Sequence, residues 1–503
     1  MQKRIKKTFH LIGNVLAGIV CLISLVVGFA LLWMNRTWKH LAIDELIYTL
    51  STPKDGTDIA MIKSFFITVI LPATIIFILL MVILLYFRKN KRIKHVTAFA
   101  ALVLPLLFGI TVSVYTVSKL DVLAYAKNRK ENAEFIDKNY IDPSQVAITF
   151  PEKKRNLIYI VSESLETADA DIANGGAFSD NYIPELTALA KNNETFSGSD
   201  STTLNGSYIL PGGTWTMGGL FSQTAGVPLQ ISVDQNDMEH QATFFPELTT
   251  LGDVLSDAGY HQTFLLGSNA TFAGRDKYFT EHGNFELLDY AYAKQNGWIP
   301  EDYGVWWGYE DEKLFQFAKE QLAQISSGSE PFNLTLLTAD THFEDGLTCQ
   351  LCRNEYPDNP YANVYRCSDR QITAFIRWIQ TQDFYENTTI VLAGDHCTMD
   401  SDFFDNADVS LDNYERKGYL TIINAPISYD KTKARDICAY DLFPTTLAAL
   451  GADIEGNRLG LGTNLYSDQI SLFDKYGLMG MKVGVSGDSP MMKRLSKIVI
   501  PPQ

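Results

Sequence analysis

Three side chains of metal-binding type follow two apolar runs of this sequence. Glu163 comes directly after residues 156–162, and Asp395 and His396 come directly after residues 389–394. Short, continuous runs of β-branched and aliphatic residues are typical of strands that are buried on both faces of a parallel sheet. Ligands of such sheets collect at the carboxyl ends of the strands, so these three side chains should meet if both runs share one sheet. Carboxylate and imidazole ligands together predict a divalent metal site.

A nucleophile is expected in the glycine-rich segment 211–219, which contains Thr214 and Thr216. Glycine permits tight turns, and a threonine at the mouth of a helix presents its hydroxyl near free backbone N–H groups. A hydroxyl is a weak nucleophile at neutral pH, and a bound divalent cation can activate it. Taken alone, the segment is more typical of a loop without function. The hypothesis of a nucleophile depends on the candidate metal ligands elsewhere in the chain.

Strands and helices alternate from Asn156 onward, which predicts a mostly parallel α/β sheet between layers of helices. The predicted strands are 156–162, 262–267, 332–338, 388–393 and 419–424. The predicted helices are 184–191, 248–258, 311–326, 368–381 and 440–450. We expect the catalytic domain to occupy residues 156–470. A polar linker at 120–155, which would adjoin the membrane region described next, precedes it, and a C-terminal tail at 471–503 follows it.

Three uncharged apolar stretches, at 11–33, 64–87 and 96–117, are long enough to cross a bilayer as helices. The first is long for a cleaved signal peptide and lacks a small-residue cleavage pattern. Basic residues gather before the first span and in the turn 88–94. The positive-inside rule then predicts a multi-pass region at 1–119 with a cytoplasmic N-terminus and an extracytoplasmic domain after it.

The charge of the chain divides at the same place. Residues 1–119 hold 14 basic and 4 acidic side chains, which leaves 28 of the 42 basic and 54 of the 58 acidic side chains for the remainder. So acidic a domain argues against nucleic-acid binding, because the phosphate backbone would be repelled. It fits a surface that faces cations outside the cell, and equally an ordinary solvated surface.

Five of the six cysteines follow the apolar spans, and Cys21 lies in the first span. The pair Cys349-x-x-Cys352 is typical of half a zinc knuckle or of a redox pair, but no second such pair follows. A disulfide from either residue to Cys367 is the favoured interpretation for an oxidising compartment. Because five is an odd number, we expect one free thiol, and Cys397 beside the predicted metal site is the candidate.

Motifs between about residue 156 and residue 465 resemble, in the same order, those of the family of phosphoglycerol transferases and lipoteichoic acid synthases. The matching segments are 156–166 (NLIYIVSESLE), 214–219 (TWTMGG), 222–223, 226–229, 251–255, 272–276, 340–342, 395–396 and 459–462. Several motifs in a fixed order are far more specific than any one of them. The resemblance implies an alkaline phosphatase/sulfatase-like extracytoplasmic α/β domain on an N-terminal bundle of three transmembrane helices.

The resemblance also implies a role for each site residue. One divalent ion, Mn²⁺ in the best-matched relatives with Mg²⁺ or Zn²⁺ as alternatives, would be bound by Glu163, Thr216, Asp395 and His396. Thr216 would attack the phosphorus of a phosphatidylglycerol-like lipid and carry the glycerophosphoryl group until a glycan or glycolipid acceptor displaces it. Arg275 and His342 match positions that contact the glycerophosphate. A guanidinium forks onto phosphate oxygens, and an imidazole can bond a hydroxyl or move its proton.

Other functions stay open at this point. A phosphoethanolamine transferase or a phosphodiesterase of the same superfamily would use the same metal set, and a degenerate domain could act as a non-catalytic membrane sensor. Sulfatase activity is disfavoured because no Cys/Ser-x-Pro-x-Arg nucleophile motif occurs in the chain. Ala273 and Gly274, before Arg275, follow the glucan-modifying branch of the family, whereas lipoteichoic acid synthases carry an aromatic residue there.

Overall fold

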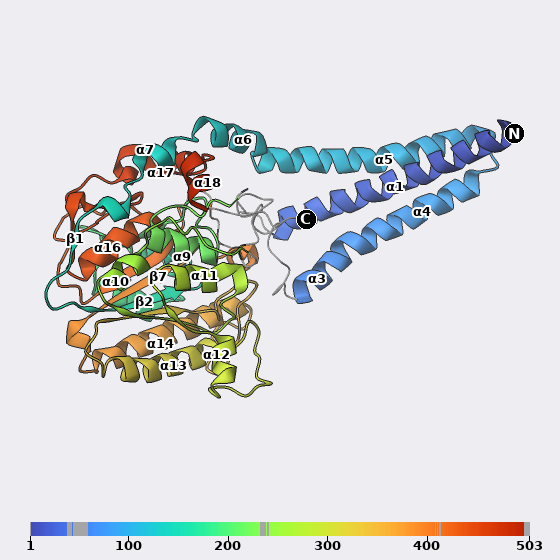
Figure 1. The fold of residues 1–503 in the computed structure, drawn as a ribbon. Coiled ribbons are helices and arrows are strands. Elements are labelled where there is room, and N and C mark those ends of the chain that lie inside the picture. Colours follow the sequence, from blue (N-terminus) through green and yellow to red (C-terminus); the bar gives the residue numbers. More distant parts are fainter. Residues whose placement is uncertain are drawn as a thin grey trace. The chain divides into compact units, whose positions relative to one another are not determined.

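The computed structural model describes residues 2–37, 43, 59–231, 238, 241–407, 409, 411 and 414–496. The chain divides into two compact units. The first consists of Met1–Ile43 and Pro53–Ala126, and the second of Asp44–Thr52 and Lys127–Gln503. The described part of the first unit is helical, and the second contains the sheets (Figure 1).

Long apolar helices make up the first unit. They are α1 (Gln2–Thr37), α3 (Ile59–Phe65), a π-helical turn (Phe66–Ile70), α4 (Leu71–Phe87) and α5 (Lys91–Lys119). Within the described residues, three stretches have the length and hydropathy of a membrane span, namely Gly13–Thr37, Met61–Phe87 and Arg92–Lys119. The three predicted spans overlap these stretches, and the expectation of three membrane helices is confirmed.

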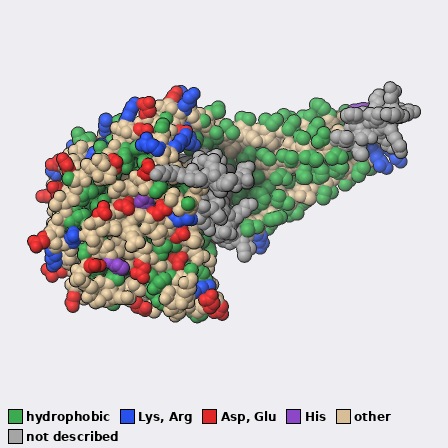
Figure 2. All heavy atoms as spheres, viewed as in Figure 1, with side chains coloured by type: hydrophobic (Ala, Val, Ile, Leu, Met, Phe, Trp, Pro, Cys, Tyr) green, Lys and Arg blue, Asp and Glu red, His purple; other side chains and the backbone are tan. Residues whose placement is uncertain are grey.

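These helices pack through a few small residues and expose apolar side chains on their outer faces. Cys21, Leu25 and Ala73 form a small buried core. A Cβ atom added to Gly28 of α1 would come within 2.3 Å of the Phe108 ring of α5, so α1 and α5 pack closely there. Figure 2 shows many hydrophobic side chains along the described face of this unit that the view presents. Apolar surface of that extent belongs in lipid, and the protein is membrane-anchored.

An eight-stranded mixed sheet forms the centre of the second unit. Its order is β5-β4-β6-β2-β7-β8-β3-β9. The strands are β2 (Asn156–Ser162), β3 (Gly206–Tyr208), β4 (His261–Leu266), β5 (Glu286–Leu288), β6 (Phe332–Leu337), β7 (Thr388–Gly394), β8 (Lys417–Ile423) and β9 (Ile437–Cys438). Strands β5, β4, β6, β2 and β7 are parallel, whereas β8 runs antiparallel to both of its neighbours.

Helices cover both faces of this sheet (Figure 1). Side chains alternate along β2, so Leu157, Tyr159 and Val161 enter one core and Ile158 and Ile160 enter the other. The first core is completed by α9, α10, α11 and α16, and the second by α8, α13 and α14. The bounds of these helices are α8 (Pro184–Lys191), α9 (Thr216–Ala225), α10 (Leu251–Asp257), α11 (Arg275–Glu281), α13 (Asp311–Ile325), α14 (Pro360–Gln380) and α16 (Leu442–Ala449).

The predicted sheet is confirmed, with additions at its edges. The five predicted strands correspond to β2, β4, β6, β7 and β8. Strands β3, β5 and β9 were not predicted, because two or three residues are too few to show a period. Helix α14 begins at Pro360, eight residues before the predicted start, where Asn359 caps it by accepting a hydrogen bond from the Ala362 N–H.

Segments on either side of the sheet also pack into the second unit. Helix α6 (Val122–Glu131) spans the boundary between the two units, and α7 (Phe135–Asn139) and β1 (Ile148–Thr149) follow it in the second unit, where β1 pairs with β10 (Asp453–Ile454). After the sheet come β11 (Arg458–Leu459), β12 (Gly462–Thr463), α17 (Leu472–Val485) and α18 (Pro490–Ser496), and α12 (Tyr290–Gln295) and α15 (Ser401–Asn406) complete the fold. The linker at 120–155 and the tail at 471–503 stay predictions, and the last seven residues of that tail lie outside the described residues.

Candidate active site

The two ligand-bearing strand ends are neighbours in the sheet. Strands β2 and β7 pair in parallel, with Ser162 opposite Gly394 at their carboxyl ends. The Asp395 N–H donates to the Ser162 carbonyl at 3.1 Å and extends the pairing by one residue. Glu163 and Asp395 therefore leave the sheet side by side, at the edge where open α/β sheets bind ligands.

Glu163, Asp395 and His396 form one buried cluster. Each side chain offers a ligand atom, and these atoms all lie within 4.8 Å of one another. The His396 Nε2 atom lies 3.3 Å from Glu163 Oε1 and 3.5 Å from Asp395 Oδ2. None of the three side chains is more than 4% exposed. Two carboxylates and an imidazole this close suit a divalent cation.

Two details of the hydrogen bonding fit a metal ion. The His396 Nδ1 atom lies 2.9 Å from the Cys397 carbonyl oxygen, so Nδ1 carries the donated hydrogen and a neutral ring keeps a lone pair on Nε2. Asp395 Oδ1 accepts hydrogen bonds from the N–H groups of Ser164 and His396, at 2.8 and 2.7 Å. Asp395 Oδ2 is buried without a hydrogen-bond partner among the described residues. A cation would satisfy that oxygen.

The protonation of the cluster in the absence of a cation also indicates that a positive charge is needed between the two carboxylates. Burial and the Glu163 charge raise the pKa of Asp395 to about 7. Burial opposes the charged form of His396, but Asp395 and Glu163 raise the pKa of its imidazole to about 10. Burial likewise opposes ionisation of Glu163, but His396 and His342 lower its pKa to about 2. A protonated imidazole thus supplies the positive charge between the carboxylates, and a divalent ion can take that role.

Several residues that the sequence analysis did not identify hold Glu163 in place. Ser164 adopts a positive φ of 53° directly after it and donates from Oγ to Glu163 Oε1 at 2.7 Å. The Glu163 N–H donates to Thr338 Oγ1 at 2.9 Å, and Thr341 Oγ1 donates to the Glu163 carbonyl at 2.5 Å. Hydroxyl residues after strands are too common for this role to be read from the sequence.

Thr216 is the first residue of α9 and points at the cluster. Its Oγ1 donates a hydrogen bond to Glu163 Oε2 at 3.1 Å. Every residue of α9 from Met217 to Ala225 is buried, so the helix is fixed against the sheet. The free N–H groups of the first turn favour negative charge beside the Thr216 hydroxyl. The Thr214 hydroxyl, two residues earlier, is buried and has no hydrogen-bond partner among the described residues.

Arg275 and His342 lie in the segments that follow β4 and β6, on the side of β2 away from β7. Arg275 begins α11, in the segment after β4, and its Nη2 donates to the Asn269 carbonyl at 2.8 Å and to Ser268 Oγ at 3.2 Å. His342 follows β6, and its Nδ1 lies 2.6 Å from the Phe343 carbonyl oxygen. Burial lowers the pKa of His342, the Glu163 charge opposes this, and the charges of His396 and Arg275 add to it. The influence of Glu163, His396 and Arg275 on the pKa of His342 indicates that these side chains lie near one another at this edge of the sheet.

Trp306 and Trp307 were not predicted to belong to the site. The His342 ring centroid lies 4.9 Å from that of Trp307 and 5.8 Å from that of Trp306. The Trp307 indole Nε1 is buried without a hydrogen-bond partner in the part of the chain that the structure describes. Adjacent tryptophans were a visible signal, but in a sequence they cannot be distinguished from ordinary core aromatics.

Comparisons with known proteins agree with this architecture. A protein-family model described as Sulfatase matches residues 155–452. Phosphoglycerol transferase I from Escherichia coli (strain 55989 / EAEC) and from Shigella flexneri are each 29% identical over 431 residues, covering 85% of this chain. The aligned region is 53% of each relative, so the chain spans about half the length of the curated relatives it matches.

A solved structure shows the same fold. The lipoteichoic acid synthase LtaP from Listeria monocytogenes superposes with a TM-score of 0.50 at 14% identity, covering 67% of this chain and 82% of that one. The Sulfatase match takes in all eight strands of the central sheet and both ligand-bearing strand ends. The chain therefore belongs to the sulfatase family, with an alkaline phosphatase/sulfatase-like α/β domain.

Proposed function

We propose that the protein is a metal-dependent transferase that moves a glycerophosphate group from a phosphatidylglycerol-like lipid to a glycan or glycolipid acceptor. The observation that carries this proposal is the contact between the Thr216 hydroxyl and Glu163, at 3.1 Å, beside the buried Asp395 and His396. A hydroxyl nucleophile at the N-terminal end of a helix, next to a candidate cation site, suits displacement at phosphorus. The 29% identity to phosphoglycerol transferase I favours glycerophosphate as the transferred group.

One divalent ion, which we propose to be Mn²⁺, would be held by Glu163, Thr216, Asp395 and His396. When bound, it would lower the pKa of the Thr216 hydroxyl and offset negative charge on the phosphate. Neighbouring groups would orient the proposed ligands. Ser164 orients the Glu163 carboxylate, and the Cys397 carbonyl fixes the His396 tautomer.

The first step would form a bond from Thr216 Oγ to phosphorus, with loss of the hydroxyl proton, and break the phosphorus–oxygen bond to diacylglycerol, which takes up one proton and leaves as an alcohol. In the second step an acceptor hydroxyl would lose its proton, bind phosphorus and release Thr216, whose oxygen regains a proton. His342, whose pKa burial lowers, would stay neutral and could accept that proton or bond the glycerol hydroxyl. Arg275 and the Trp307 indole N–H would bind the anionic and polar groups of the donor.

The membrane region fits a lipid donor. Three apolar spans keep the second unit attached to a bilayer, which holds the donor at high local concentration. We propose that the N-terminus and the turn 88–94 are cytoplasmic and that the catalytic unit is extracytoplasmic, as the distribution of basic residues predicts.

The assignment of Thr216 can be tested with the purified full-length protein in detergent and phosphatidylglycerol labelled in its unacylated glycerol. Thr216→Ala should abolish formation of the labelled protein adduct and of transferred product, and Thr216→Ser should retain part of both. The matched control is Thr214→Ala, which removes the same hydroxyl two residues away and should keep activity. Undiminished turnover in Thr216→Ala, or loss only in Thr214→Ala, would overturn the assignment.

Donor choice is a separate measurement. The wild-type protein is given phosphatidylglycerol and phosphatidylethanolamine in parallel, and diacylglycerol release is followed. Faster release from phosphatidylethanolamine would contradict the proposed donor and favour a phosphoethanolamine transferase. Release of free glycerophosphate at the same rate with and without glycan acceptors would indicate a phosphodiesterase.

A further inference from the structure

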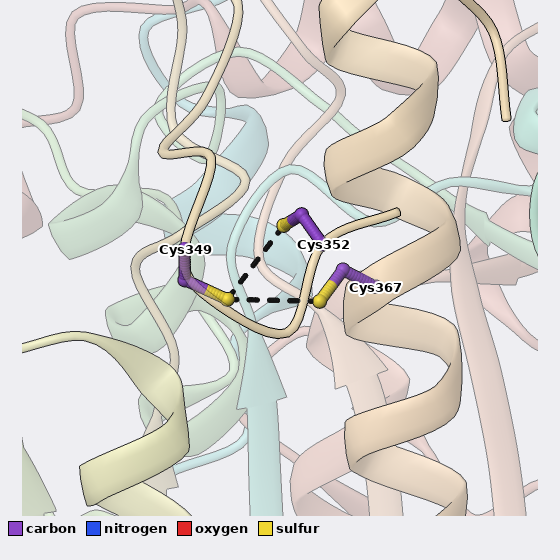
Figure 3. A group of neighbouring side chains, drawn as sticks. All are labelled: Cys349, Cys352 and Cys367. Atoms are coloured by element: carbon purple, nitrogen blue, oxygen red, sulfur yellow. Dashed lines mark hydrogen bonds between the residues drawn. The ribbon is translucent and has the colours of Figure 1, made fainter. Parts of the chain in front are cut away.

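Three cysteines that the proposed reaction does not use form a cluster separate from that of Glu163, Asp395 and His396. Cys349 and Cys352 lie on the loop after β6, and Cys367 lies on α14 (Figure 3). Their sulfur atoms point toward one another (Figure 3), at 3.6 Å from Cys349 to Cys352 and 3.7 Å from Cys349 to Cys367. All three sulfurs lie within 4.8 Å of one another, and each is a free thiol.

These distances fit three corners of a metal tetrahedron. For a zinc–sulfur bond of about 2.3 Å, the sulfurs of a tetrahedral site are separated by about 3.8 Å. A disulfide requires about 2.05 Å and would have to draw two of these sulfurs together while leaving the third aside. In the structure the Cys349 sulfur stands almost equally far from both of the others and favours neither pairing.

A tight turn also brings two of the cysteines together. The Cys352 N–H donates to the Cys349 carbonyl oxygen at 3.1 Å, and the turn that this bond closes keeps the two sulfurs close to each other. Cys367 is buried, and Cys349 and Cys352 are partly exposed, so an ion could enter from one side.

We propose that Cys349, Cys352 and Cys367 form a second metal site, distinct from the Glu163 cluster, for a zinc-class thiophilic divalent ion. In the part of the chain that the structure describes, the cluster contains only these three groups of metal-ligand type. Solvent or a small external ligand would take the fourth position. Sulfur donors select against Mn²⁺ and Mg²⁺, so the two sites would hold different ions.

The position of this site gives it a structural task. The loop after β6 carries His342, and its first part is tied to α14 by the Tyr361 hydroxyl, which donates to the Thr341 carbonyl at 2.5 Å. The cysteines would tie a later part of the same loop to the same helix. With the Tyr361 bond at one end and the bound ion at the other, the segment from Thr341 to Cys352 would be held on α14 at both ends, which would keep His342 in place.

Cobalt binding tests the site by a signal that does not depend on activity. Full-length protein is purified in detergent with a reductant, treated with a chelator and titrated with Co²⁺. A thiolate-to-cobalt charge-transfer band should appear in the wild type, in Glu163→Gln, which disables the other cluster, and in Cys21→Ser, the matched cysteine control. The band should be lost in Cys349→Ser. A wild-type titration without the band, or an unchanged band in Cys349→Ser, overturns the proposal.

A second measurement needs only the wild-type protein, in case Cys349→Ser does not fold. Alkylation of each cysteine is followed by peptide mass spectrometry with Zn²⁺, with Mg²⁺ or with neither ion. Zn²⁺ should slow alkylation of Cys349, Cys352 and Cys367 together, and Mg²⁺ should not. Equal alkylation in all three samples, or an intact mass two hydrogens lower that Zn²⁺ and reductant leave unchanged, would show a disulfide or free thiols and exclude the metal site.

Discussion

A Cβ atom added to Gly219 would lie 2.3 Å from the carbonyl oxygen of Asp395. The helix that carries Thr216 therefore packs directly against the backbone of Asp395, at a distance that only glycine permits. We predict that Gly219→Ala pushes the start of α9 away from the cluster and destabilises the protein by about 1–3 kcal/mol. Activity should fall more than the folded fraction does, because Thr216 moves relative to Glu163.

Thermal unfolding and turnover, measured on the same preparations, check this prediction. Gly328→Ala is the matched control, since its added Cβ would meet only the Ile325 carbonyl oxygen at 3.4 Å. A Gly219→Ala protein with normal stability and normal turnover would mean that α9 can shift without disturbing the site.

The Glu163 cluster should make stability depend on a divalent ion. With Mn²⁺ at about 100 times its dissociation constant, the wild type should gain about 2.7 kcal/mol of unfolding free energy. Asp395→Asn should lose most of this gain, because it removes the charge at the buried Oδ2, which has no hydrogen-bond partner among the described residues. Unfolding midpoints with and without Mn²⁺ measure the effect, and Asp383→Asn, at an exposed position, should respond like the wild type. Equal responses of all three proteins would place the ion elsewhere.

A buried ion pair joins the segments that follow β2 and β7. Arg416 Nε donates to Glu166 Oε2 at 2.7 Å, and Arg416 Nη2 donates to the Thr398 carbonyl at 2.8 Å. Glu166 is fully buried, so Arg416→Met leaves an uncompensated carboxylate and should cost about 3–5 kcal/mol of stability. Denaturant unfolding measures this cost.

An exposed pair provides the comparison for Arg416. Arg377 Nη2 lies 2.7 Å from Glu185 Oε2, but the Arg377 side chain is 65% exposed. Arg377→Met should therefore change stability by no more than about 1 kcal/mol. The double variant Glu166→Gln/Arg416→Met should recover part of the loss. If Arg416→Met and Arg377→Met were equally stable, the buried pair would not hold together the segments that follow β2 and β7.

His282 should make stability fall at alkaline pH. Its Nδ1 lies 2.9 Å from Asp253 Oδ2 and its Nε2 lies 2.8 Å from the Phe244 carbonyl oxygen, so both ring nitrogens face acceptors. Burial opposes the charged ring, but the hydrogen bond and charge of Asp253 raise the pKa of His282 above 6.5. A raised folded-state pKa means that the stabilisation is complete below pH 6.5 and is lost as the pH rises through the folded-state value.

Unfolding free energies between about pH 6 and pH 9 test the role of His282. His282→Gln should lose about 2 kcal/mol at the acidic end and show a flatter profile. His261→Gln is the control, because the His261 side chain is 44% exposed and lies 3.7 Å from Glu286. Parallel profiles of the wild type and His282→Gln would refute a charged His282.

The central strands could be predicted because their pattern is local. Strands β2 and β7 are continuous apolar runs, and the predicted and observed bounds differ by at most one residue. Helix α9 could not be predicted, because Gly218 and Gly219 disfavour helix by themselves. Its stability comes from burial of nearly its whole length, which depends on strands distant in the sequence.

The candidate site divides in the same way. Glu163, Asp395 and His396 were identified from strand ends alone, whereas the roles of Arg275 and His342 came only from resemblance. Trp307 and Thr341 were missed, because their contacts depend on loops whose course has no periodic signal. The proximity of Cys367 to Cys349 and Cys352 was predicted and is present through the packing of α14, but the favoured disulfide is not formed in the structure, where the sulfurs stand 3.6 and 3.7 Å apart.

The junction of β2 and β7 also sets when the protein can become active. The Ser164 N–H and Asp395 Oδ1 are 231 residues apart in the chain and meet only after β7 has docked. A nascent or truncated chain that ends before residue 388 would keep Glu163 and Thr216 but would lack Asp395 and His396. Under the proposed function such a fragment would be inactive at the membrane, because two of the four proposed cation ligands would be missing.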